Sequence, residues 1–177
     1  MTEWVALLRG VNVGSITVRS ADLRRVLEDL GLDGVRTVLA SGNATFASPT
    51  PAARRDTLKK RIEGALRAEF DYDAWVLLFT RSELAHAADR FPFDAADDTR
   101  QPWLLFCVDA DTRDELVAAA ADLDGDRDPV ASGPGVVYWN PPKGSTTDTP
   151  FAKIIGRRTY KERTTNRNLR TVLKILG

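Results

Sequence analysis

The chain has 177 residues, of which 43% are hydrophobic and 28% are charged, and its formal net charge is zero. This composition is that of an ordinary globular protein, and a single cysteine excludes an internal disulfide framework. No apolar run approaches the ~20 residues that a bilayer-spanning helix needs. The early charges Glu3 and Arg9 do not match the layout of a signal peptide. We therefore expect a cytoplasmic protein in a reducing compartment, with no membrane contact.

The first 80 residues alternate between strand-like and helix-like segments. The expected strands are residues 4–9, 35–40, 44–47 and 74–79, and the expected helices are 20–30 and 51–70. In the first helix, apolar residues fall at positions i, i+3, i+4 and i+7 from Leu23, with Ser20 as N-cap and Gly31 as the stop. The resulting order, β-α-β-β-α-β, is that of a ferredoxin-like unit.

The same order starts again after a helix at 81–90 and a loop rich in proline and aspartate at 91–102. Strands are expected at 103–108, 129–132 and 136–139, and helices at 112–123 and 150–158. A final helix, 166–176, stands where a sixth element would be. We predict an α+β protein with two tandem ferredoxin-like subdomains, antiparallel sheets and a C-terminal helix. The expected boundaries are 1–80 for the first lobe, 81–101 for the connecting helix and loop, and 102–177 for the second lobe.

Charge is unevenly distributed along the chain. Residues 81–128 hold 13 acidic and 5 basic side chains, a balance of −8. Residues 151–177 hold 8 basic side chains and one acidic side chain, a balance of +7. The basic segment could contact an anionic or nucleic-acid partner, or pack against the acidic block and cancel it. The second interpretation is favoured.

Residues for common catalytic chemistry are scarce. With one histidine and one cysteine, ordinary zinc sites and Cys–His catalysis are disfavoured. His86 lies on a short helix and is expected to be partly exposed, whereas Cys107 lies in the apolar run LLFCV and is expected in the core. The chain has neither a P-loop lysine pattern nor the GxGxxG spacing. We expect no metal and no cofactor.

The stretch LLRGVNVG at residues 7–14 ends the first strand. In the order β-α-β-β-α-β the first two strands run in the same direction, so this end lies at the same sheet edge as the turn at 41–43. Backbone N–H groups and short polar side chains would gather there, a combination that suits an anion. The residues concerned are Arg9, Gly10, Asn12, Gly14, Ser41, Gly42 and Asn43. The alternative is that Gly10 and Gly14 serve only loop geometry and that residues 41–43 form only a tight turn.

A third polar segment, at residues 165–168, opens the expected last helix. Thr165 is expected as its N-cap, and its buried face is expected to be Leu169, Val172, Leu173 and Leu176. A cation in the first turn opposes the helix dipole. Arg167 and Asn168 are therefore expected to face an anion or a carboxylate. The alternative is a cap followed by ordinary surface charge.

These three segments resemble the domain of unknown function 1697 family of bacterial proteins. The matching motifs are RGVNVG (9–14), VRTVLASGNATF (35–46) and TNRNLRTV (165–172), so the resemblance covers nearly the whole chain. It implies two tandem ferredoxin-like subdomains but no established activity, substrate or cofactor. The hallmark positions map onto Arg9, Gly10, Asn12, Gly14, Ser41, Gly42, Asn43, Thr165, Arg167, Asn168 and Thr171. Two positions depart from the family pattern: Leu169 replaces an aromatic residue, and Ser15 replaces a glycine.

The leading interpretation is a binding module for a small phosphate- or carboxylate-bearing ligand at a polar edge formed by the three motifs. One alternative is an enzyme in which Arg9 and Arg167 stabilise developing negative charge; its general base would be a guess between Asp22 and Asp148. Another is an RNA-binding module like the RRM domains, although the strand ATFA offers one aromatic residue and neither RRM signature is present. The sequence favours binding over catalysis and does not indicate an oligomeric state.

Overall fold

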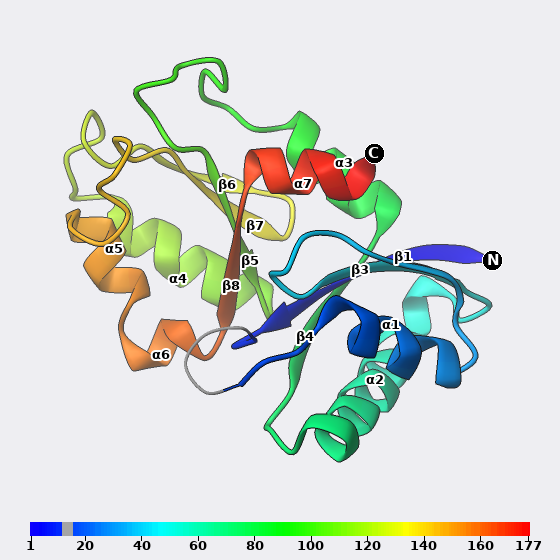
Figure 1. The fold of residues 1–177 in the computed structure, drawn as a ribbon. Helices are drawn as coiled ribbons and strands as arrows, with labels where there is room; N and C mark the ends of the chain where they lie inside the picture. Colours follow the sequence, from blue (N-terminus) through cyan, green and yellow to red (C-terminus); the bar gives the residue numbers. More distant parts are fainter. Residues whose placement is uncertain (12–15) are drawn as a thin grey trace. The chain divides into compact units, whose positions relative to one another are not determined.

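The computed structural model describes residues 1–11 and 16–177 and divides the chain into two compact units. The first unit contains Met1–Leu84 and Lys174–Gly177, and the second contains Ala85–Leu173. Each unit is built on one four-stranded antiparallel sheet with helices (Figure 1). The predicted α+β class is confirmed at this level.

The first unit follows the predicted order of elements. It contains β1 (Thr2–Arg9), α1 (Ser20–Asp29), β2 (Asp33–Thr37), β3 (Asn43–Ser48), a 3-10 turn η1 (Ala52–Arg54), α2 (Arg55–Phe70) and β4 (Trp75–Thr80). The strands lie in the order β2-β3-β1-β4. Helix α3 (Arg81–Asp89) follows β4 directly. The predicted second helix is thus divided, because its first turn after Pro51 is a 3-10 turn.

The core of the first unit lies between its sheet and helices α1 and α2, which cover one face of the sheet (Figure 1). Alternate residues of β1, Trp4, Ala6 and Leu8, point to this face and are at most 1% exposed. They pack with the helix residues Leu27 and Ile62. The β1 residues between them are buried as well, so β1 is covered on both faces. Full burial of a large apolar side chain contributes about 1.5–3 kcal/mol.

The second unit repeats the order and adds a strand that the sequence did not predict. It contains β5 (Trp103–Cys107), α4 (Ala110–Ala120), β6 (Val130–Gly133), β7 (Val136–Trp139), α5 (Pro150–Ile155), α6 (Arg158–Lys161), β8 (Thr164–Asn168) and the first part of α7 (Leu169–Leu176), whose last three residues belong to the first unit. The strands lie in the order β6-β7-β5-β8. The sixth element is therefore β8, and the C-terminal helix comes after it.

A buried carboxylate ties strand β7 to helix α5 in the second core. Asp128, 3% exposed, accepts hydrogen bonds from Trp139 Nε1 and from the backbone N–H of Phe151, both at 3.0 Å. Trp139 and Phe151 also pack edge to face, with ring centroids 5.6 Å apart. Cys107 belongs to the same core, as predicted.

Three local predictions are wrong. Ser20 is the first residue of α1 and Arg19 is its N-cap, with no side-chain cap bond among the described residues. Thr165 is not a helix cap, because it lies inside β8. Leu173 is 51% exposed, and Ile175, at 2%, takes the buried position on α7.

One residue of the basic segment does contact the acidic block. Arg163 Nη1 lies 2.9 Å from Glu115 Oε2, and its Nη2 lies 3.7 Å from Asp109 Oδ1. At this residue the charges of the basic segment and the acidic block partly cancel. No helix within the described ranges has both the length and the apolar character to cross a membrane.

Candidate functional site

The end of strand β1 and the turn between β2 and β3 lie side by side. The backbone N–H of Leu8 donates to the carbonyl of Gly42 at 2.8 Å, one residue beyond the paired positions Leu7 and Asn43. Arg9 and Gly10 therefore adjoin the turn. We call the group Arg9, Gly10, Ser41, Gly42 and Asn43 the polar edge.

Gly42 is required by the close approach of the two loops. Its φ is +70°, and a Cβ atom there would lie 2.5 Å from Val11 Cγ2 and 2.9 Å from Leu8 Cβ. Such distances are far inside van der Waals contact, so only glycine lets the loops meet in this way. Gly10 also has a positive φ, +72°, but no described atom lies within 4 Å of a Cβ built on it.

The buried side chain of Asn43 holds the turn between β2 and β3 together by hydrogen bonds. Its side chain is fully buried, and its Nδ2 donates to the carbonyl of Val38 at 2.9 Å and to Ser41 Oγ at 2.8 Å. The backbone N–H of Val38 donates in return to the Asn43 carbonyl at 3.0 Å. Between them Leu39 has a φ of +58° and is 48% exposed. Both amide protons of Asn43 thus have acceptors within the turn.

Arg9 supplies the charge of the polar edge. Its guanidinium carbon lies 5.8 Å from the ring centroid of Trp75, the residue paired with it on β4. Lys59 Nζ lies 5.7 Å from the same ring. In the ranges 1–11 and 16–177, Arg9 makes no ion pair with a carboxylate, so an aromatic face rather than an acid supports it.

The third motif lies on β8, at the edge of the second sheet. Arg167 pairs with Leu104 and Thr165 with Phe106, so both lie on the face opposite the core residue Leu105. Arg167 is 8% exposed, and its Nη1 donates to Thr165 Oγ1 and to the Asn166 carbonyl, each at 2.9 Å. Burial lowers its pKa to about 10, so it stays cationic at neutral pH.

The dipole argument for Arg167 is wrong, because this residue precedes the helix. The helix α7 begins after Asn168, whose Oδ1 accepts a hydrogen bond from the backbone N–H of Arg170 at 3.0 Å. Asn168 therefore occupies the capping role that the sequence suggested for Thr165. The wider prediction, one site built by all three motifs, involves both units and stays a prediction. Asn12 and Gly14 lie outside the described residues.

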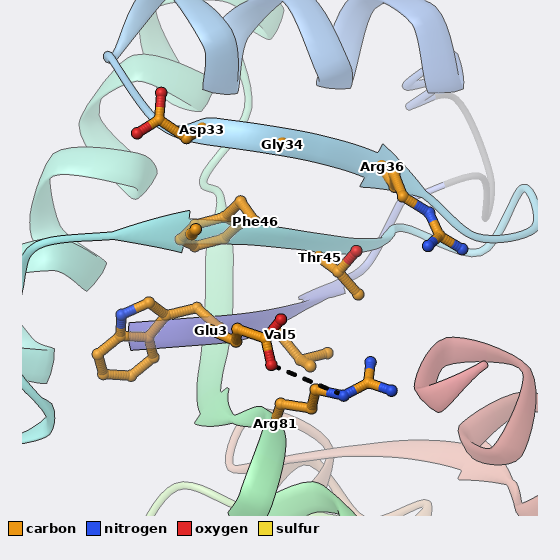
Figure 2. A pocket seen from close by; sticks show the side chains of 10 residues that line it. Glu3, Val5, Asp33, Gly34, Arg36, Thr45, Phe46 and Arg81 are labelled. Atoms are coloured by element: carbon orange, nitrogen blue, oxygen red, sulfur yellow. Dashed lines mark ion pairs between the residues drawn. The ribbon is translucent and has the colours of Figure 1, made fainter. Parts of the chain in front are cut away.

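A cavity that the sequence did not indicate lies in the first unit, at the opposite end of β1. It has a volume of about 190 Å³ and is lined by Glu3, Val5, Arg36, Thr45 and Arg81, among others (Figure 2). Arg81 Nε lies 3.8 Å from Glu3 Oε2, and its Nη2 donates to the carbonyl of Leu176. In the sequence, the residues of β1 that alternate with the helix-facing ones are a weak indication of this surface. Of its charged residues, Glu3 and Arg81 form an ion pair.

The histidine and the cysteine behave as expected from the sequence. His86 is exposed on α3, and Cys107 is buried on β5. Burial raises the pKa of the Cys107 thiol to about 12, with a smaller contribution from the nearby Asp109 carboxylate. The described part of the chain contains no cluster of three histidine, cysteine or acidic residues that could hold a metal ion.

The family model described as "Protein of unknown function (DUF1697)" matches residues 1–138. The chain belongs to this family. The first two motifs lie inside the matched range and the third lies beyond it. The DUF1697 chain is also similar to the solved structure of the conserved bacterial protein SP0830 from Streptococcus pneumoniae, at 25% sequence identity and a TM-score of 0.81. The similarity covers 99% of this chain and 97% of that chain. No curated protein matches.

Proposed function

We propose that this protein is a binding module for a small anion, carrying a phosphate or a carboxylate group, at the polar edge of its first unit. The observation that supports this most is the hydrogen bond from the Leu8 N–H to the Gly42 carbonyl. It joins the end of β1 to the β2–β3 turn, so that a cation, an exposed hydroxyl and two glycines with positive φ share one edge.

Arg9 is the charge-bearing residue of this proposal. A guanidinium binds phosphate or carboxylate through two parallel N–H bonds, and each hydrogen bond to a charged group contributes roughly 1.5–3 kcal/mol. The ring of Trp75 supports the guanidinium without neutralising it. Lys59, near the same ring, lies 3.8 Å from Glu63 Oε1, so its charge is offset by that carboxylate and Arg9 is the cation that matters here.

The other members of the polar edge divide into two roles. Gly42 and Asn43 shape the turn, because Gly42 permits the close approach and Asn43 holds the Val38 and Ser41 acceptors. The groups that would meet the ligand are the half-buried Arg9, the exposed Ser41 and the exposed backbone at Gly10. Thr165, Arg167 and Asn168 are not needed for binding in this form of the proposal.

We also infer that the two units are tandem copies of a ferredoxin-like fold in a cytoplasmic protein. Both units have the order β-α-β-β-α-β, and the strand orders β2-β3-β1-β4 and β6-β7-β5-β8 correspond position by position. The single, buried cysteine fits a reducing compartment.

Thermal shift with inorganic phosphate and with citrate tests the binding proposal. An anion present at ~100 Kd stabilises the folded protein by about 2.7 kcal/mol, and the melting temperature rises accordingly. Arg9→Ala should lose most of this shift. Without anion it should melt close to the parent, because a cation–π contact contributes only ~0.5–1 kcal/mol.

Arg54→Ala is the matched control. Arg54 is exposed and makes no ion pair within the described ranges, so this variant changes the net charge equally but leaves the polar edge intact. It should keep the full anion-induced shift. Equal shifts in Arg9→Ala and the parent would refute the proposal. A large loss of melting temperature in anion-free Arg9→Ala would make Arg9 a structural residue instead.

A further inference from the structure

A second basic site lies entirely within the second unit, in a pocket of about 240 Å³. We call it the basic pocket; the lining residues that matter here are Asp98, Arg100, Gln101, Lys143, Asn168 and Arg170. These residues come from the segment before β5, the loop after β7, and the junction of β8 with α7. The pocket thus combines three parts of the chain that are far apart in sequence.

The backbone around the basic pocket is held by three hydrogen bonds between these segments. The N–H of Gln101 donates to the Pro141 carbonyl at 3.0 Å, and the N–H of Lys143 donates to the Thr99 carbonyl at 2.8 Å. The N–H of Leu169 donates to the Pro102 carbonyl at 2.9 Å. The cationic side chains therefore start from a fixed framework, which lowers the entropic cost of gathering them around a ligand.

Arg100 is oriented by neutral acceptors. Its Nη1 donates to the Asn140 carbonyl at 3.3 Å and its Nη2 donates to the Asp126 carbonyl at 2.7 Å. Two of the five guanidinium protons are used in this way, and the positive charge is not cancelled by these carbonyls. The half-buried side chain is thus placed in advance, with N–H groups left over for an anion.

The charges lining the basic pocket are unbalanced. Arg100, Lys143 and Arg170 stand against the single carboxylate of Asp98, and none of the three cations makes an ion pair with any carboxylate that the structure describes. The adjacent Asp97 accepts hydrogen bonds from the N–H and the hydroxyl of Thr99, at 2.9 and 2.6 Å. Asp97 does not line the pocket, but its negative charge lowers the positive electrostatic potential there.

We propose that the basic pocket binds the phosphate groups of a small phosphorylated molecule, with a diphosphate as the best match. Three cations that line one pocket favour a polyvalent anion, and guanidinium and amide donors suit phosphate oxygens. The volume is below the 300–1,000 Å³ typical of sites for drug-sized ligands, so a phosphate group and little else is enclosed. This site shares no residue with the polar edge and does not depend on the function proposed for it.

Isothermal titration at low ionic strength, with inorganic pyrophosphate and a nucleoside diphosphate in parallel, tests the proposal. The double variant Lys143→Ala/Arg170→Ala should weaken pyrophosphate binding by at least ~10-fold, the scale of one lost charged contact. Lys153→Ala, an exposed cation of α5 outside the pocket, is the control and should bind like the parent. Tighter binding of the nucleoside diphosphate would identify the diphosphate of a larger molecule as the ligand, and equal affinity would identify the free anion.

Three outcomes would overturn the inference. The first is no pyrophosphate binding by the parent at millimolar concentration, and the second is equal binding by the parent and the double variant. The third is binding that Arg9→Ala abolishes and the double variant retains, which would assign the anion to the polar edge. Circular dichroism of each variant checks that the fold is intact. Lys143→Glu, which changes an exposed side chain, gives a second test if the double variant unfolds.

Discussion

Gly42 is the residue at which the two loops of the polar edge come closest together. Gly42→Ala should destabilise the protein, because its Cβ would lie 2.5 Å from Val11 Cγ2 in a backbone with φ of +70°. The left-handed conformation costs roughly 1–2 kcal/mol, and overpacking adds about 1–3 kcal/mol. Urea unfolding should therefore show a loss of about 2–5 kcal/mol.

Gly10→Ala separates the two contributions. Gly10 has nearly the same φ, +72°, but the described atoms leave open space around its Cβ position. This variant should lose only the conformational cost, roughly 1–2 kcal/mol. If the two variants unfold at the same urea concentration, the loops do not approach as closely as the Gly42 geometry requires.

At the scale of elements, the strand β8 shows where a sequence pattern stops being informative. A half-buried strand is recognised by alternating apolar residues, but the buried positions of β8 are Thr165 and Arg167, and both are polar. The strand lies at the edge of its sheet, so it needs only one partner strand, β5. With Thr165 and Asn168 both acceptable as helix caps, the sequence alone could not place the helix start.

More of the polar edge than of β8 could be predicted from the sequence, because the position of the polar edge depends on strand direction. A helix between the first two strands requires both to run the same way, and this places Arg9 beside the turn at Gly42. The sequence could not show that Asn43 turns inward, because that follows from the backbone path through Leu39, at φ +58°. Likewise, the basic pocket depends on contacts between distant loops that no local pattern encodes.

Helix α7 gives a direct test of the corrected buried face. Ile175 is 2% exposed and Leu173 is 51% exposed, although both are large apolar residues two positions apart. Ile175→Ala should lower the free energy of unfolding by about 2–5 kcal/mol, as expected for a large-to-small core substitution. Leu173→Ala should change it by less than about 0.5 kcal/mol. Chemical denaturation of both variants checks this, and the reverse ranking would restore the face predicted from sequence.

At the scale of the whole molecule, buried acidic groups predict a loss of stability in alkali. Burial raises the pKa of Cys107, Tyr72 and Tyr138 to about 12 each. Below its unfolded-state pKa, each group is protonated in both states and its contribution is fully present. As the pH rises toward 12, the unfolded chain releases the proton first, so stability falls by about 1.4 kcal/mol per pH unit for each proton held only by the folded state.

Arg167 has the opposite effect on stability at high pH. Because burial lowers its pKa to about 10, the unfolded chain binds more protons there above that pH, and stability rises in the same range. Three groups lower stability in alkali and Arg167 raises it, so the free energy of unfolding should fall overall. The fall should begin near pH 9, where Cys107 ionises in the unfolded chain, and it should steepen above pH 10, where the tyrosines ionise there too. Urea unfolding across this range measures the slope.

Tyr72→Phe isolates one of these contributions. The Tyr72 hydroxyl is buried and finds no hydrogen-bond partner among the described residues, whereas the Tyr138 hydroxyl donates to the Ala87 carbonyl at 2.6 Å. Removing the Tyr72 hydroxyl should leave stability at neutral pH equal or higher, because a buried polar group without a partner is costly. It should also make the alkaline decline in stability shallower.

Tyr138→Phe is the control: it should flatten the alkaline decline equally but lower stability at neutral pH by about 1–3 kcal/mol, since the Ala87 carbonyl loses its donor. An alkaline slope in Tyr72→Phe as steep as that of the parent would show that Tyr72 ionises without opposing the fold.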